Sequence, residues 1–402
     1  MEDSNKVMEH KTWWTSRKYF FRQLFISSGA WICYFITGLS FGASTVFIPQ
    51  IRAEANSTEA VTEEVASWIP TIMVYSGLPW SCILPISMNI LGRKYTFAIV
   101  SICNLFSFII LYFSKTVTHI IISEFINGIN TGAQFTVTVT IIAEYTSPKH
   151  RGFFLTAKSA TLFWGILVAN AVGTYFHWKN IALIGIACCI YCFVLSFILP
   201  ESPYWFISKH RVEKCSKVHR WLKGADMQSE RELEQLIDFQ KQADKNSIET
   251  NFTLNDYLKS QVKIIFKKQF YKPLVLCILV QFLYVFSGKV VFSVYAIDII
   301  RNITKDQEIS AYTAMLILDG VTVSFMYIGC GFAKIFARKM LLIVTSVVGI
   351  SFLISISIYT YMIKLNIVEE NNYVTIALMI GYSIGIACGP IILTQALCGE
   401  LI

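Results

Sequence analysis

Long runs of apolar residues, each close to twenty residues in length, alternate with short polar segments along most of the chain. An α-helix rises about 1.5 Å per residue, so a run of this length crosses the roughly 30 Å hydrocarbon layer of a bilayer. The runs lack the alternation of apolar and polar residues that a membrane β-barrel requires. The pattern therefore predicts an all-α protein that crosses a membrane several times.

The apolar runs fall into two groups. They cover residues 27–49, 68–90, 96–114, 120–143, 153–176, 181–199, 273–300, 311–336, 340–363 and 373–397. A charged stretch rich in Lys, Glu and Gln separates the sixth run from the seventh, and we interpret it as a linker of short solvated helices. The predicted segments are a cytoplasmic N-terminus (1–26), a six-helix bundle (27–200), the linker (201–272) and a bundle of about four helices (273–402).

Composition supports a membrane protein and excludes other classes. With 54% hydrophobic and 15% charged residues, the chain is too apolar for a soluble multi-domain protein. The net charge of +8 lies largely in short loops, where it indicates topology rather than nucleic-acid binding. By the positive-inside rule, the N-terminus and the linker are expected in the cytoplasm.

The cysteines indicate no metal site and no disulfide. Cys188, Cys189 and Cys192 lie within one apolar run, without a histidine nearby. Small buried side chains in a membrane helix explain them better than metal ligands do. The chain also lacks a nucleophile elbow and a phosphate-binding loop. We therefore expect no cofactor and no enzymatic activity.

A short basic motif occurs twice and reveals an internal repeat. Gly92-Arg93-Lys94 follows the second run of the first group, and Ala337-Arg338-Lys339 follows the second run of the second group. Many transporters consist of two halves of like topology, with the substrate site near the bilayer midplane between them. The second half has four runs where the first has six, so we expect the chain to be shortened at its C-terminus.

Several further motifs carry a resemblance to a known family. They are Ala143-Glu144, Ser147-Pro148-Lys149-His150-Arg151-Gly152, Gly165-Ile166-Leu167, Pro200-Glu201-Ser202-Pro203, Ser287-Gly288 and Gly389-Pro390. Together with the repeated basic motif, they make the chain resemble the sugar-porter branch of the major facilitator superfamily, and within it the insect facilitated trehalose transporter-like proteins. The resemblance implies two helical bundles, about ten of twelve transmembrane helices, and facilitated sugar transport by alternating access, in the plasma membrane.

The same resemblance implies a cytoplasmic gate made of charged residues. The matching positions are Arg93, Glu144, Arg151, Glu201 and Arg338. Ion pairs at helix ends are worth about 1 kcal/mol each, so several can hold a gate shut and still break during the transport cycle. A second interpretation stays open, in which the arginines simply follow the positive-inside rule.

The substrate cavity that the resemblance implies has an unusual composition. The candidate residues are Ser159, Gln281, Ser287, Gly288, Lys289 and Tyr295. The family binds sugars through side-chain amides, which both donate and accept hydrogen bonds, and most of those amides are replaced here. Ser159, for example, stands where the family has a glutamine.

Lys289 lies deep inside the seventh apolar run, where a charge costs about 3 kcal/mol or more unless it meets a partner or water. It is expected to pair with an internal carboxylate, Asp319 or Glu124, or to face an anionic group of the substrate; a third interpretation is that it extends to the membrane surface. Lys158, nearer a helix end, is expected to extend to the cytoplasmic interface.

Three functions follow from these observations. The leading hypothesis is transport of a small polar solute, a sugar such as trehalose or a hexose, across the lipid bilayer. The second is transport of an organic anion or a proton-coupled solute that uses Lys289. The third is a membrane sensor or a degenerate protein that transports nothing. Asn56 and Asn302 lie in sequons of predicted outer loops and are glycosylation candidates.

Overall fold

The structure is a computed structural model that describes residues 2–55, 61–248, 268–289, 308–368 and 371–401. Within these ranges the regular structure is helical, and eight helices are long and apolar enough to cross a membrane. The predicted all-α membrane architecture is confirmed. The helices are α1 (Glu2–Glu54), α2 (Glu63–Ile90), α3 (Arg93–Tyr112), α4 (Val117–Phe135), α5 (Val137–Tyr145), α6 (Pro148–Tyr175), α7 (Lys179–Ile198), α8 (Pro203–Ser208), α9 (Val212–Lys223), α10 (Met227–Ile248), α12 (Lys268–Phe286), α15 (Glu308–Ile335), α16 (Arg338–Lys364), α17 (Asn372–Cys388) and α18 (Pro390–Leu401).

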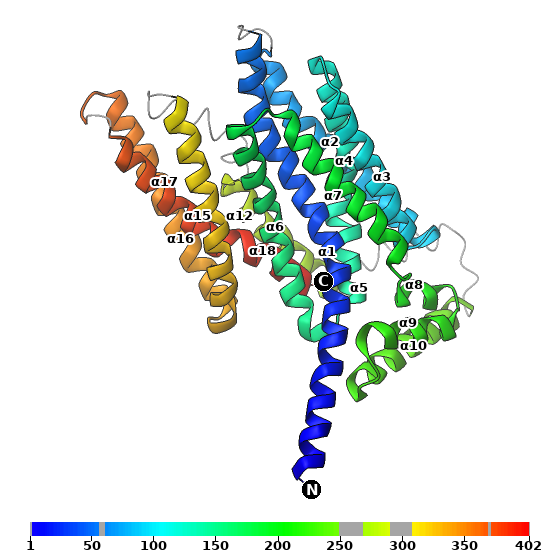
Figure 1. Cartoon of the computed structure of the whole chain (residues 1–402). Coiled ribbons are helices and arrows are strands. Elements are labelled where there is room, and N and C mark those ends of the chain that lie inside the picture. The colour runs from blue at the N-terminus through cyan, green and yellow to red at the C-terminus, as the bar shows by residue number, and fades with distance from the viewer. Residues whose placement is uncertain (1, 56–60, 249–267, 290–307, 369–370, 402) are drawn as a thin grey trace.

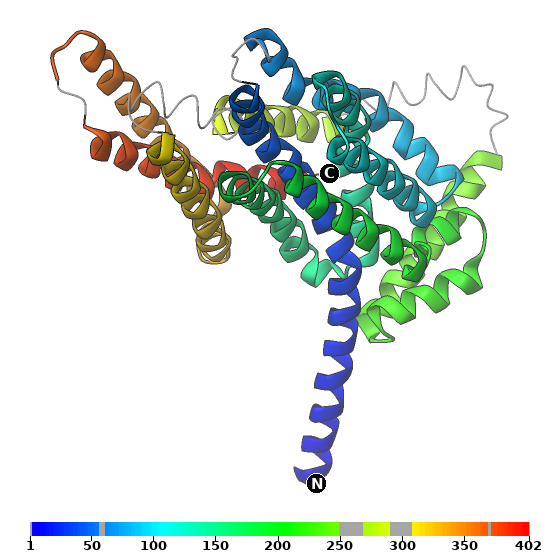
Figure 2. The ribbon, with the colours of Figure 1, turned by 45° about the horizontal axis from the view of Figure 1, so that its top comes forward.

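Two groups of helices lie side by side (Figures 1 and 2). Helices α1 to α7 pack together as a first bundle, and α12 to α18 form a second bundle beside it. The short helices α8 to α10 lie at one end of the first bundle, which we call the linker end; the opposite end is the far end. The first part of α1 projects beyond the bundle at the linker end, well outside the expected span of residues 27–49.

Glycines allow α1 and α6 to approach each other closely. A Cβ atom on Gly38 would lie 1.9 Å from the carbonyl oxygen of Leu162, and one on Gly165 would lie 2.2 Å from that of Phe35. Small residues at such a crossing let two membrane helices gain van der Waals contact along their backbones. This contact holds α6 against α1 and fixes the position of its polar side chains.

Two expected spans are broken into separate helices. The run 120–143 forms α4 and α5 with a break at Thr136, and the run 373–397 forms α17 and α18 with a break at Gly389. Pro390 explains the second break, because proline disfavours a helical conformation in the residue before it. A Cβ on Gly389 would also lie 1.7 Å from Thr345 Oγ1, so only glycine fits there.

Helix α6 joins the two bundles. It lies against α15 and α18 of the second bundle, and its residues Ala160, Phe163 and Ile166 share an apolar core with Met326 and Ile391. In the same region, Trp164 Nε1 donates a hydrogen bond of 2.9 Å to Tyr327 Oη. The interface between the bundles is therefore packed around α6.

Candidate functional site

A charged cluster lies at the linker end of the first bundle. Arg93, the first residue of α3, binds Glu144 of α5 through two hydrogen bonds, Nε to Oε2 at 2.9 Å and Nη2 to Oε1 at 2.7 Å. Both side chains are only 12% exposed. Ser202 Oγ also donates to Glu144 Oε2, at 2.5 Å. A two-point pair of this kind, partly shielded from water, fixes the orientation of both side chains.

Glu201 completes this cluster from the loop between α7 and α8. Its carboxylate accepts hydrogen bonds from the backbone N–H groups of Arg93 at 2.7 Å and Lys94 at 3.3 Å. These are unpaired donors at the start of α3, so Glu201 caps that helix from a distant part of the chain. Burial raises the pKa of Glu201, and the bound N–H groups oppose that rise.

Gly92 makes the cap possible. Its φ is +99°, and a Cβ atom there would lie 2.2 Å from Glu201 Oε2. A side chain would therefore meet both backbone strain and the carboxylate. The cap on α3 therefore explains why the first copy of the basic motif begins with glycine.

The other two predicted gate residues are placed differently. Arg151, in the first turn of α6, interacts with the hydroxyl group of Tyr204, and its buried Nε has no hydrogen-bond partner among the described residues. Arg338 begins α16 in the second bundle. The structure brings Arg93, Glu144 and Glu201 together; the gate role of all five stays a prediction.

The linker contains a buried ion pair that sequence reasoning missed. Lys223, at the end of α9, pairs with Glu232 of α10 at 3.0 Å, and its side chain is 2% exposed. Beside it, burial lowers the pKa of His219 to about 4. The spacing of Cys215, His219 and Leu222 on one helical face could have revealed that this part of the linker is packed rather than solvated.

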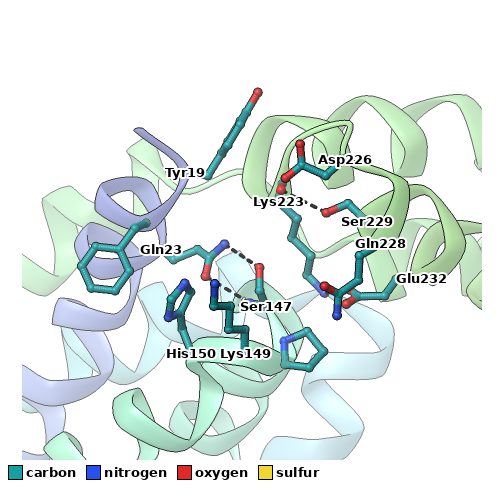
Figure 3. A pocket seen from close by; sticks show the side chains of 12 residues that line it. Tyr19, Gln23, Ser147, Lys149, His150, Lys223, Asp226, Gln228, Ser229 and Glu232 are labelled. Atoms are coloured by element: carbon teal, nitrogen blue, oxygen red, sulfur yellow. Dashed lines mark hydrogen bonds and ion pairs between the residues drawn. The ribbon is translucent and has the colours of Figure 1, made fainter. Parts of the chain in front are cut away.

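A polar pocket adjoins this ion pair (Figure 3). It lies where α1, the turn before α6 and the linker helices meet. Gln23 Nε2 donates to Ser147 Oγ at 2.9 Å and to the carbonyl of Leu222 at 3.2 Å, while the N–H of Ser147 donates to Gln23 Oε1 at 3.1 Å. One glutamine thus ties α1 to the turn before α6 and to the linker helix α9.

Buried charged groups meet between the two bundles. Lys289 is 2% exposed, and its charge interacts with that of Asp319 on α15. Asp319 Oδ2 in turn accepts a hydrogen bond of 2.6 Å from Asn170 Nδ2 on α6. Of the two carboxylates expected near Lys289, Asp319 is the one found there, whereas Glu124 interacts with Asn127 on its own helix.

Lys158 also lies inside the protein, so the expectation that it extends to the membrane surface was wrong. The residue is 4% exposed, and its Nζ lies 4.8 Å from the centre of the Tyr34 ring. Tyr34 Oη donates a hydrogen bond of 2.9 Å to the carbonyl of Gln134, at the end of α4. The side chain turns inward because α1 packs closely against this face of α6, which places the Tyr34 ring within reach.

The structure describes four other predicted cavity residues, Ser159, Gln281, Ser287 and Gly288. Ser159 is buried beside Lys158, and Gln281 is half-buried on α12. Helix α12 ends just before Ser287, whose carbonyl accepts a hydrogen bond from Tyr382, and Gly288 has a φ of +73°. The expected continuous span 273–300 is therefore interrupted at this point. Tyr295, Asn56 and Asn302 lie outside the described residues.

Two polar atoms near the interface between the bundles were not anticipated. Gln134 Oε1 and Asn170 Oδ1 are buried and have no hydrogen-bond partner among the described residues. Both atoms belong to side-chain amides, the kind of group that the resemblance implies for sugar binding. Gln134 and Asn170 are, however, at other positions than the amides expected from the resemblance. A search of α4 and α6 for polar residues within apolar runs would have found them.

These features define a class of protein. A membrane protein of two helical bundles, with polar groups buried between them, has the architecture of a secondary transporter. The model of the sugar (and other) transporter family matches residues 26–402, and the chain belongs to this family. It is a family of transporters and not of enzymes.

Individual relatives carry the name "facilitated trehalose transporter Tret1". The protein of Apis mellifera ligustica is 24% identical over 354 residues, which cover 88% of this chain and 68% of the relative. That of Bombyx mori is 24% identical, with 89% and 68% covered. That of Drosophila willistoni is 26% identical, with 81% of this chain but 35% of the relative covered. The chain thus spans between about a third and two thirds of these relatives.

Solved structures confirm the fold. The xylose transporter XylE from E. coli, in a partially occluded inward open conformation, is 16% identical; the match covers 94% of this chain and 89% of that one, with a TM-score of 0.69. The major facilitator superfamily proton:xylose symporter XylE bound to 6-bromo-6-deoxy-D-glucose gives a TM-score of 0.72, with 16% identity and 96% and 86% covered. The expected major facilitator fold is therefore present.

Proposed function

We propose that this chain is a secondary transporter that carries a sugar, trehalose or a hexose, by alternating access of its two bundles. The observation that carries the proposal is a pair of acceptors, Gln134 Oε1 and Asn170 Oδ1, which are buried near the bundle interface and have no partner in the described ranges. A buried acceptor without a donor costs about 1–3 kcal/mol. A sugar presents many hydroxyl donors and relieves that cost when it binds.

The family and the names of the relatives support the same solute class. The alternative in which Lys289 binds an organic anion is weakened, because the carboxylate of Asp319 already interacts with the Lys289 amine. An anion would have to compete with that carboxylate. The neutral sugar therefore remains the better candidate for this part of the site.

In this proposal the linker end faces the cytoplasm, the N-terminus is cytoplasmic, and the protein is in the plasma membrane. The cations Arg93, Lys94, Lys149 and Arg151 gather at the linker end, as the positive-inside rule requires. The cluster of Arg93, Glu144 and Glu201 then lies at the cytoplasmic end of the transport path, where it stabilises the conformation of the first bundle that closes the gate.

The test is uptake of radiolabelled trehalose and glucose by cells that express the chain, with the amount at the surface measured in parallel. We expect saturable uptake that excess unlabelled sugar inhibits. Gln134→Leu should lower uptake per molecule at the surface, whereas Asn104→Leu should lower it much less; Asn104 is a buried amide of α3 that donates to Asn130 of α4. Protein at the surface without saturable uptake of either sugar would refute the proposal.

A further inference from the structure

Within the part of the chain that the structure describes, Lys158 is a buried cation without a carboxylate partner. Its side chain lies inside the protein, and among the described residues no ion pair includes it. The contact that the structure gives its amine is the face of the Tyr34 ring at 4.8 Å. A cation–π contact contributes only about 0.5–2 kcal/mol. That is less than the cost of a charge within the membrane, about 3 kcal/mol or more.

The buried carboxylates of the membrane helices that the structure describes lie at other levels. Asp319 is bound to Asn170, which is twelve residues beyond Lys158 on α6 and so about 18 Å further along the helix axis. Glu124 lies ten residues before Gln134 on α4, about 15 Å along that axis. Neither carboxylate reaches the amine of Lys158. Its charge therefore needs an anion that the described part of the chain does not supply.

The surroundings of Lys158 suit a ligand that also carries hydroxyl groups. Tyr34 links the lysine to Gln134, whose Oε1 is a buried acceptor without a donor among the residues that the structure describes. Tyr284 of α12 packs against the same core from the second bundle. Residues from both bundles thus converge here, about 15 Å along α6 from its linker end and about 8 Å past Phe153, where the apolar run begins. Transporters of this architecture bind their substrates between the two halves.

We propose that Lys158 binds the carboxylate of a hydroxylated organic acid, so that the substrates of this transporter include sugar acids. This inference rests on the proposed function, because it names a substrate class for the same site. One unpaired ammonium group matches one carboxylate in charge, whereas a neutral sugar leaves the ammonium uncompensated. The hydroxyl groups of the acid supply the donors that Gln134 Oε1 lacks. Tyr34 keeps the amine in place between the two bundles.

The experiment compares uptake of radiolabelled glucuronate and glucose at pH 7.4 in cells expressing the full chain, normalised to protein at the surface. Glucuronate is ionised at this pH. We expect saturable glucuronate uptake that glucose competes for. Lys158→Met should lower the ratio of glucuronate to glucose uptake at least tenfold, and Lys158→Arg should keep it within threefold. Lys115→Met, an exposed lysine between α3 and α4, is the matched control and should leave the ratio unchanged.

The outcomes separate this inference from the function on which it rests. Saturable glucose or trehalose uptake without glucuronate uptake would overturn the inference and leave sugar transport standing. An equal loss of both activities in Lys158→Met would assign the lysine a purely structural role and also overturn it. If the cells took up glucose 6-phosphate in preference to glucuronate, the group that Lys158 binds would be a phosphate and not a carboxylate, and the inference would be refuted. Absence of any uptake would remove both proposals.

Discussion

Gly92 offers a direct test of how the linker-end cluster is built. In Gly92→Ala, the new methyl group would lie 2.2 Å from Glu201 Oε2, in a backbone conformation with φ of +99°. With ψ at 170°, this backbone conformation is adopted almost only by glycine, and it costs another residue about 1–3 kcal/mol. Displacing Glu201 also removes the cap of α3, which is worth about 1 kcal/mol. The two costs together are about 2–4 kcal/mol, or a roughly 30- to 700-fold change in the ratio of folded to unfolded protein.

The assay is the temperature at which detergent-solubilised protein loses its monodisperse elution peak after heating. Gly152→Ala is the matched control, because a Cβ at Gly152 meets no atom within 4 Å and the residue lies in the first turns of α6. Alanine favours a helix over glycine by about 1 kcal/mol, so this control should match the wild type or exceed it. Gly92→Ala should melt clearly below both.

Equal melting temperatures for Gly92→Ala and Gly152→Ala would refute this reasoning. A double variant separates the two costs. Adding Glu201→Ala to Gly92→Ala removes the carboxylate that the methyl group meets, so the second substitution should cost much less in the Gly92→Ala background than alone. Simple additivity would mean that the carboxylate and the methyl group do not meet.

Two further predictions concern buried titratable groups. Asp319→Asn leaves the Lys289 charge without its partner and should destabilise the protein by about 3–5 kcal/mol, while the double variant with Lys289→Met should recover most of that loss; heating assays in detergent check both. His219 has a folded-state pKa of about 4, below its unfolded value of about 6.5, so its contribution is complete above pH 6.5 and is lost as pH falls toward 4. Melting temperatures between pH 7.5 and 4.5 should fall less steeply for His219→Gln than for the wild type, and the exposed His119→Gln should keep the wild-type slope.

The membrane architecture was predictable because it depends on local properties of the sequence. An apolar run of about twenty residues specifies a spanning helix wherever it packs. The break at Thr136 was not predictable in the same way, since neither proline nor glycine marks it. The break at Gly389 had its signal in Pro390, and the sequence interpretation passed over it.

The candidate site was predictable where motifs carry it and less so elsewhere. The motif residues Arg93, Glu144 and Glu201 lie together as the motifs suggest. The prediction for Lys158 was wrong because it used only the distance of this residue from the helix end. It did not consider that Lys158 lies on the face of α6 that packs against α1. Gln134 escaped notice because its importance comes from Tyr34, which is a hundred residues away in sequence. Contacts of this range depend on the packing of whole helices.

The polar contacts of this chain divide between two tasks. Arg93, Glu144 and Ser202 join helices and loops of the first bundle only, so their cluster shapes that bundle and does not by itself hold the two bundles together. The hydrogen bonds of Asn170 with Asp319 and of Trp164 with Tyr327 do cross between the bundles, and both lie along α6 and α15. A rocking motion that preserves these two bonds must keep α6 beside α15. The moving surfaces are then the other faces of the bundles, away from the contact of α6 with α15.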